Sequence, residues 1–170
     1  GSMGRRLWQL SNCQDSRRIK PHGAAKSISA ETTFFDDISE FEELKRKLWP
    51  LCERVAKRAK KAEIAGKTVT LKLKTASFRS RTRSQTLPNP TLLADVLYET
   101  ALPLLEPEAD GTPFRLMGIG MSSLTDADLA DPADLLDPGA TRRADAERAM
   151  DSVRAKFGED AIKKGRGLKR

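Results

Sequence analysis

The chain has 170 residues, of which 38% are hydrophobic, 32% charged and 5% aromatic, and its formal net charge is +7. This length fits one domain with extensions, not two full domains. No apolar run approaches the roughly 20 residues that a membrane span requires. Two cysteines, Cys13 and Cys52, and the single His22 lack the spacing of metal ligands, so we expect no zinc or haem site. Unpaired cysteines also fit a reducing compartment.

The charge is divided along the chain. Residues 64–90 contain six basic side chains and no acidic one, whereas residues 91–137 contain ten acidic side chains and a single basic one, Arg115. Such segregation favours a directed electrostatic field over general solubility.

The N-terminal quarter has little periodic pattern. Residues 1–3 are typical of an expression scar and are excluded from the fold. Leu7, Trp8 and Leu10 fit the end of a helix too short to be stable alone. The remainder of residues 4–25 is expected to be a tether, with the ordered domain running from 26 to 125.

The first expected strand covers residues 26–34, because Ile28, Ala30, Thr32 and Phe34 alternate with polar side chains. Ser39 and Glu42 then have the spacing of a capping box. A long amphipathic helix is predicted from there to about Ile64. Pro50 should kink or interrupt this helix, and Gly66 should cap its C-terminus.

Two further strands are predicted over 68–74 and 78–85, joined by a turn near Ala76 and closed by Pro88 and Pro90. A second helix over 91–105 is disturbed by Pro103. A fourth strand covers 113–124.

This order predicts an α+β fold, β-α-β-β-α-β, with a four-stranded antiparallel sheet and two helices on one face. Residues 126–170 are expected to add an acidic linker, an amphipathic helix over 141–157 that ends at Gly158, and a basic tail.

No catalytic constellation is present in the sequence. Asp36 and Asp37 lack the third carboxylate that a two-metal site needs, and His22 lies in the tether. Gly118 and Gly120 fall within a strand, which makes them a weak signal for a phosphate loop. We therefore predict neither a catalytic nor a metal site.

The basic hairpin is the strongest candidate for function. If Val69, Leu71 and Leu73 face the helices, alternation turns Lys72 and Lys74 outward, and we expect Arg79, Arg81 and Arg83 to face outward with them. Such a face suits the phosphates of nucleic acid.

Three alternatives remain for this hairpin. The first is that the charges merely keep the edge of the sheet soluble. The second is that Arg81 or Arg83 anchors the acidic linker. A third is an RNA-recognition module, which needs aromatic side chains on the sheet face, whereas Phe34 and Phe78 are spaced to point inward.

Several motifs resemble one known family. They are Leu7-Trp8, Lys26-Ser-Ile-Ser, Glu31-Thr-Thr-Phe34, the run from Gly66 to Lys74, the run from Phe78 to Ser84, and the run from Arg115 to Leu124. In this order they resemble the end of the thumb and the little finger domain of Y-family DNA polymerases of the DinB, or DNA polymerase IV, type.

The resemblance implies a non-catalytic domain that binds duplex primer-template DNA. The residues implied as DNA-binding are Lys26, Ser27, Ser29, Lys72, Lys74, Arg79, Arg81, Thr82 and Arg83. It also implies that the palm, with its Mg²⁺ ions and the polymerase activity in translesion synthesis, lies upstream of Gly4 in a longer protein of the bacterial cytoplasm.

The acidic linker adds a hypothesis about a partner. Bacterial relatives dock on the sliding clamp through a short peptide, and Asp134, Leu135 and Leu136 keep part of it but lack its Gln and aromatic residue. An ordinary linker is the alternative. A clamp-recruiting interaction module is therefore a second functional hypothesis, beside the DNA-binding one.

Overall fold

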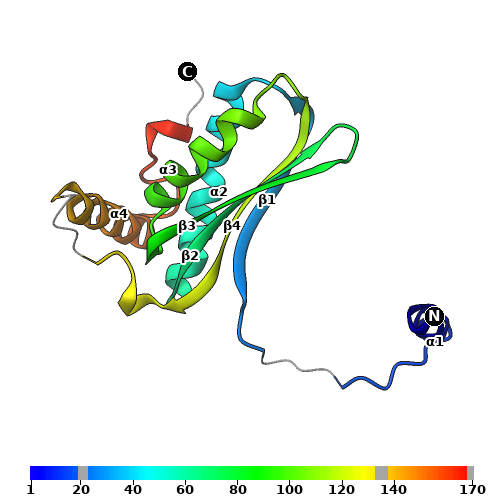
Figure 1. Ribbon diagram of the computed structural model, residues 1–170. Helices are drawn as coiled ribbons and strands as arrows, with labels where there is room; N and C mark the ends of the chain where they lie inside the picture. Colours follow the sequence, from blue (N-terminus) through cyan, green and yellow to red (C-terminus); the bar gives the residue numbers. More distant parts are fainter. Residues whose placement is uncertain (19–22, 133–137, 168–170) are drawn as a thin grey trace.

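Four strands form an antiparallel sheet in the order β1-β4-β2-β3 in this computed structural model, which describes residues 1–18, 23–132 and 138–167 (Figure 1). The strands are β1 (Ser27–Ile38), β2 (Ile64–Thr75), β3 (Ser80–Thr91) and β4 (Phe114–Asp126). Helices α2 (Phe41–Lys61) and α3 (Ala94–Leu105) cover one face of the sheet. The predicted fold class is confirmed, and β1 and β3 are the sheet edges.

Helix α2 runs through Pro50 without a break. Pro50 lies on the exposed side of the helix, so water can satisfy the carbonyl group that its missing N–H leaves unpaired. The capping box was wrong, because the helix begins at Phe41 after Glu40 and no side chain caps it. Gly66 is not the C-cap either. It lies in β2, and the chain turns at Glu63, which has a positive φ of 54°.

The strands of the hairpin are longer than predicted. β3 continues through Pro88 and Pro90 to Thr91. Proline is tolerated there because β3 is an edge strand, whose outer N–H groups have no ladder partner to lose. The turn near Ala76 is confirmed, since β2 ends at Thr75 and β3 begins at Ser80.

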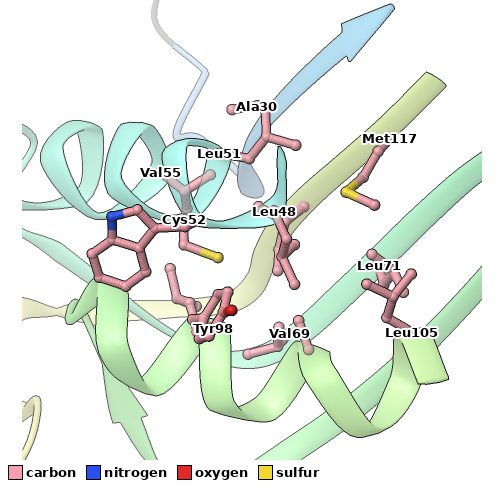
Figure 2. Packing of buried hydrophobic residues seen from close by; sticks show 14 of the residues in the cluster. Ala30, Leu48, Leu51, Cys52, Val55, Val69, Leu71, Tyr98, Leu105 and Met117 are labelled. Carbon is pink, nitrogen blue, oxygen red and sulfur yellow. The ribbon is translucent and has the colours of Figure 1, made fainter. Parts of the chain in front are cut away.

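The core lies between α2, α3 and one face of the sheet. Figure 2 shows side chains of α2 (Leu48 and Val55), β2 (Leu71) and α3 (Tyr98 and Leu105) in one cluster of buried residues. Leu48, Val55 and Leu105 are fully buried. Removing this much apolar surface from water provides the main driving force that holds the helices on the sheet.

The N-terminal helix α1 (Ser2–Ser11) is longer than expected and has no buried residue. A helix of this length with no packed face is marginal in isolation. The register of the sheet, not this segment, positions the candidate site.

Helix α4 (Pro138–Phe157) packs on the outer side of α2 and α3 through charged side chains. The Glu147 carboxylate accepts hydrogen bonds from the N–H groups of Ala94 (2.9 Å) and Asp95 (3.4 Å), at the start of α3. It also pairs with Lys60 at 2.6 Å. Glu147 therefore caps α3, where a negative charge complements the helix dipole.

The residues after α4 fold back onto the same helices. Lys164 and Arg166 both pair with Asp95, whose side chain is only 7% exposed. The Arg166 guanidinium lies 5.6 Å from the ring centre of Trp49 and 5.2 Å from that of Tyr98. We call α4 together with residues 158–167 the C-terminal clasp.

Candidate nucleic-acid interface

The register of the sheet defines the face that α2 and α3 leave uncovered. Lys72 on β2 lies opposite Thr82 on β3 and Gly118 on β4, and Gly118 lies opposite Glu31 on β1. Directly opposed residues share a face, so these four form one row. The flanking rows are Ser29, Gly120, Thr70 and Ser84 on one side, and Thr33, Leu116, Lys74 and Ser80 on the other. We call these three rows the open face.

The expectation that Arg81 and Arg83 project from this face together with Lys72 was wrong. Arg81 lies opposite Leu73, and Arg83 lies opposite Leu71, so both arginines share the face of the buried leucines. Because β3 is an edge strand, the long side chains of these arginines can extend past the edge of the sheet instead of into the core.

Both arginines pair with the acidic segment that follows α3. Arg81 lies 3.1 Å from Glu108 and 3.3 Å from Asp110, and Arg83 lies 2.6 Å from Glu108. The Glu108 side chain is 5% exposed, so the guanidinium groups neutralise a buried carboxylate. The alternative that these arginines anchor acidic residues is thus supported, although the anchored segment is 106–112 and not the linker after β4.

Hydrogen bonding fixes the charge states at this anchor. Bonds from Thr112, and then from Arg81, hold the pKa of Asp110 at about 2. The hydrogen bond to Glu108 raises the pKa of Arg81 above its ordinary value. Arg81 and Asp110 are therefore both charged throughout the physiological range.

The tip of the hairpin carries a cationic and aromatic cluster. Phe78 has a positive φ of 64° and is 62% exposed, so the expectation that it points inward was wrong. The Arg115 guanidinium lies 4.0 Å from the centre of its ring, and the Lys74 ammonium lies 5.6 Å from it. Arg79 is exposed in the turn. Phe34, by contrast, is partly buried against the core as expected.

The N-terminal end of β1 contributes hydroxyl groups. Ser27 lies opposite Ser122, and Ser29 lies opposite Gly120, while Lys26 is exposed just before the strand. A hollow of about 320 Å³ lies over this part of the sheet. Its lining includes Ser27, Ser29, Thr70, Lys72 and the two glycines of β4.

Sequence reasoning missed Glu31. Its carboxylate lies 2.8 Å from the Lys72 ammonium on the open face. Alternation along β1 placed Glu31 on the side of Ser29, but only the strand order brings β1 within reach of β2.

Several predicted features lie elsewhere or outside the described part. Asp36 and Asp37 are exposed at the end of β1, and within residues 1–18, 23–132 and 138–167 no three His, Cys, Asp or Glu side chains are grouped to hold a metal ion. Asp134, Leu135 and Leu136 lie outside the described residues. None of the helices described in this chain has the length and apolar character needed to cross a membrane.

Comparison of sequences identifies relatives along nearly the whole chain. DNA polymerase IV of Brucella melitensis is 53% identical over 165 residues, covering 97% of this chain and 37% of the relative. DNA polymerase IV of Caulobacter vibrioides is 46% identical, covering 99% of this chain and 42% of the relative. The chain thus spans about two fifths of the length of these relatives.

Solved structures share the fold. A little finger domain of DNA polymerase IV, in complex with the beta-clamp processivity factor, superposes with a TM-score of 0.50 at 23% identity, over 64% of this chain and 92% of that one. A Dbh–Dpo4 chimera of Y-family DNA polymerase gives 0.55 at 13% identity, over 74% of this chain and 36% of that one. The family model described as impB/mucB/samB family C-terminal domain matches residues 25–133. The chain therefore belongs to this family; its relatives are DNA polymerases IV, and its fold is that of the little finger domain of Y-family DNA polymerases.

Proposed function

We propose that this domain binds duplex primer-template DNA through the open face, with little preference for sequence. The observation that carries the proposal is the composition of that face. Apart from Glu31 and Leu116, its three rows present hydroxyl groups, glycines and two lysines, and the helices lie on the opposite side. Lysines neutralise phosphates and hydroxyls donate hydrogen bonds to them, and neither contact reads a base.

Lys72 and Lys74 are the principal contacts in this proposal. As alternate residues of one strand they lie about 7 Å apart on the same side of the sheet. Gly118 and Gly120 carry no side chain, so a DNA backbone can approach β4 closely. Further proposed contacts, all exposed or on the open face, are Lys26, Ser27, Ser29, Arg79 and Thr82.

Arg81 and Arg83 have a different place in the proposal. Their guanidinium groups are engaged by Glu108 and Asp110, and the side chain of Arg81 is only 32% exposed. We assign them to holding the 106–112 segment against the hairpin. Arg83, at 54% exposed, lies nearer to solvent and can add a peripheral contact with DNA.

The longer protein is proposed to be a DNA-directed DNA polymerase of translesion synthesis, active in the bacterial cytoplasm. This rests on the names of the relatives, of which the chain covers only a part. The Mg²⁺ ions of nucleotidyl transfer would be bound by the palm of that protein, and this domain would hold the template duplex in place.

Clamp docking is a second candidate, supported by the solved complex of a related little finger domain with the beta-clamp processivity factor. The proposed contact is Asp134, Leu135 and Leu136. Gel filtration of the chain with clamp tests it, with Leu135→Ala and Leu136→Ala as variants. Co-elution that both substitutions leave unchanged would rule out this peptide.

Fluorescence anisotropy with a labelled 20-base-pair duplex, the matching single strand and the matching RNA tests the DNA-binding proposal. We expect the duplex to bind most tightly, with an affinity that falls steeply with salt and that scrambling the sequence leaves unchanged. A preference for RNA would instead favour the RNA-recognition alternative. Failure to bind any duplex at low salt would end the proposal.

A further inference from the structure

Glu31 and Lys72 meet across a strand that separates them. β1 and β2 are not neighbours in the sheet, because β4 lies between them. Adjacent strands are about 4.8 Å apart, so the backbones of β1 and β2 are separated by about twice that distance. The Lys72 ammonium nevertheless lies 2.8 Å from the Glu31 carboxylate. Both side chains therefore reach toward each other over β4.

Gly118 makes this contact possible. It is the residue of β4 that lies opposite both Glu31 and Lys72. A Cβ atom at Gly118 would lie 2.9 Å from the Cβ of Glu31, closer than such atoms approach. Any other residue would also place a side chain directly beneath the ion pair. The pair thus depends on a glycine at this position of the row.

The pair is open to competition from solvent and ligands. The side chain of Lys72 is 44% exposed and that of Glu31 is 52% exposed, so neither charge is locked in the interior. The hollow over Gly118 and Gly120 lies beside the pair and is lined by Glu31 and Lys72 themselves. A phosphate that enters this hollow meets the ammonium already held by a carboxylate.

We propose that Glu31 is a built-in competitor of the DNA backbone for Lys72, and that it limits the affinity of this domain for duplex. The inference rests on the DNA-binding function proposed above. In the free domain the carboxylate neutralises Lys72. In the complex a phosphodiester takes its place, and the displaced carboxylate stays close enough to repel the neighbouring phosphates.

This arrangement suits a domain that must hold a duplex and also move along it. The contact between Lys72 and a phosphate replaces an existing ion pair, so its net gain is smaller than that of an unpaired lysine. Each phosphate contact is correspondingly easier to exchange for the next. Glu31 therefore lowers the affinity for duplex and makes no attractive contact with it.

Replacing Glu31→Gln tests the inference, because it removes the charge and nearly preserves the size of the side chain. We expect Glu31→Gln to bind a labelled 20-base-pair duplex about two- to fivefold more tightly, the range set by one exposed ion pair. The dependence of affinity on salt should steepen by no more than about one ion.

Glu42→Gln is the matched control. Glu42 also pairs with a lysine on the surface, Lys45 at 3.3 Å, but it lies on α2, on the other side of the sheet. Glu42→Gln changes the net charge of the domain by the same amount as Glu31→Gln and should leave the affinity for duplex within twofold of the wild-type value. An equal gain in duplex affinity in both variants would mean that net charge alone explains the effect, and it would overturn the inference.

The double variant with Lys72→Gln completes the cycle. If Glu31 acts on Lys72, the gain from Glu31→Gln must shrink when Lys72 is absent. If Lys72→Gln weakens duplex binding but Glu31→Gln leaves it unchanged, the proposal that Glu31 competes for Lys72 is wrong. The DNA-binding proposal would then remain intact. A wild-type domain that binds no duplex would instead remove the proposed function itself. Urea midpoints of all variants confirm that each is folded.

Discussion

Leu73 of β2 and Arg81 of β3 lie directly opposite each other, so the arginine shares the helix-covered face of the sheet with a buried leucine. One residue earlier on β2, Lys72 lies opposite Thr82 on the open face. The positive charge of the hairpin is therefore divided between two faces. Lys72 and Lys74 are directed to the side from which DNA is proposed to approach, whereas Arg81 and Arg83 are not.

This division predicts different outcomes for two double variants. Lys72→Gln with Lys74→Gln should weaken duplex binding and reduce the slope of log affinity against log salt by about two, because two phosphate contacts are lost. Arg81→Gln with Arg83→Gln removes the same charge but should reduce the slope by less than one. Anisotropy titrations over a range of salt concentrations measure both.

The arginine variant should instead lower stability. It leaves the buried Glu108 carboxylate without either of its cations, which is unfavourable in a poorly solvated position. We expect a lower urea midpoint for this variant than for the lysine one. Equal slopes and equal midpoints in the two variants would mean that the faces are not functionally distinct.

Alternation predicted the strands and the inner face of β2 correctly, but it could not fix the register of β3 against β2. Spacing predicts that Phe78 points inward, and the same alternation places Arg79, Arg81 and Arg83 outward. At the end of a projecting hairpin there is no core to enter, so polarity does not decide the face. Phe78 instead lies in the turn with a positive φ.

The C-terminal clasp shows a second limit of sequence reasoning. The sequence predicts an amphipathic helix over residues 141–157, yet Phe157 at its end is 68% exposed. The buried contacts come from Ala144 and the charged Glu147. A carboxylate that caps another helix more than fifty residues away leaves no periodic signal in the chain.

Glu147 is expected to stabilise the domain as the cap of α3. Glu147→Gln keeps one acceptor but removes the charge that pairs with Lys60 and complements the helix dipole. We expect it to lower the free energy of unfolding by about 1–2 kcal/mol, the usual range for loss of a cap. Urea denaturation followed by circular dichroism measures the change.

Asp145→Asn is the control for this prediction. Asp145 lies on the same helix and pairs with Arg148 at 3.2 Å, but both side chains are well exposed. Its loss should cost less than about 0.5 kcal/mol, as is typical of exposed ion pairs. If Asp145→Asn destabilised the domain as much as Glu147→Gln, the burial of Glu147 would not be the cause.

Removing residues 138–170 should destabilise the domain although the family match ends at residue 133. Trp49 is 2% exposed and lies beneath Lys164 and Arg166 of the clasp. In the truncated chain we expect its fluorescence to shift to longer wavelength and the urea midpoint to fall. A Trp8→Phe background isolates the signal of Trp49.

The same truncation should leave duplex affinity nearly unchanged under conditions where the chain stays folded. The clasp contacts α2 and α3, which lie on the side of the sheet away from the open face. A large loss of binding by a folded truncated chain would place part of the DNA contact in the clasp.

The two cysteines should react very differently with thiol reagents. Cys13 is exposed, whereas Cys52 is fully buried in α2, and burial raises the pKa of the Cys52 thiol well above its ordinary value of 9.0. Since the thiolate is the reactive form, native protein should label rapidly at one position only. Mass spectrometry of the labelled chain identifies the position.

In a Cys13→Ser background, labelling of Cys52 therefore reports on opening of the core. A raised pKa in the folded state means that the stability due to this thiol is present below pH 9.0 and declines as the pH rises above it, because only the unfolded thiol ionises there. Labelling should accelerate in Glu147→Gln, whose α3 is less firmly held on α2, and remain slow in Asp145→Asn. Rapid labelling of Cys52 in the unmodified fold would contradict its burial. Equal labelling rates in the two variants would mean that capping by Glu147 does not affect how firmly α3 packs on α2.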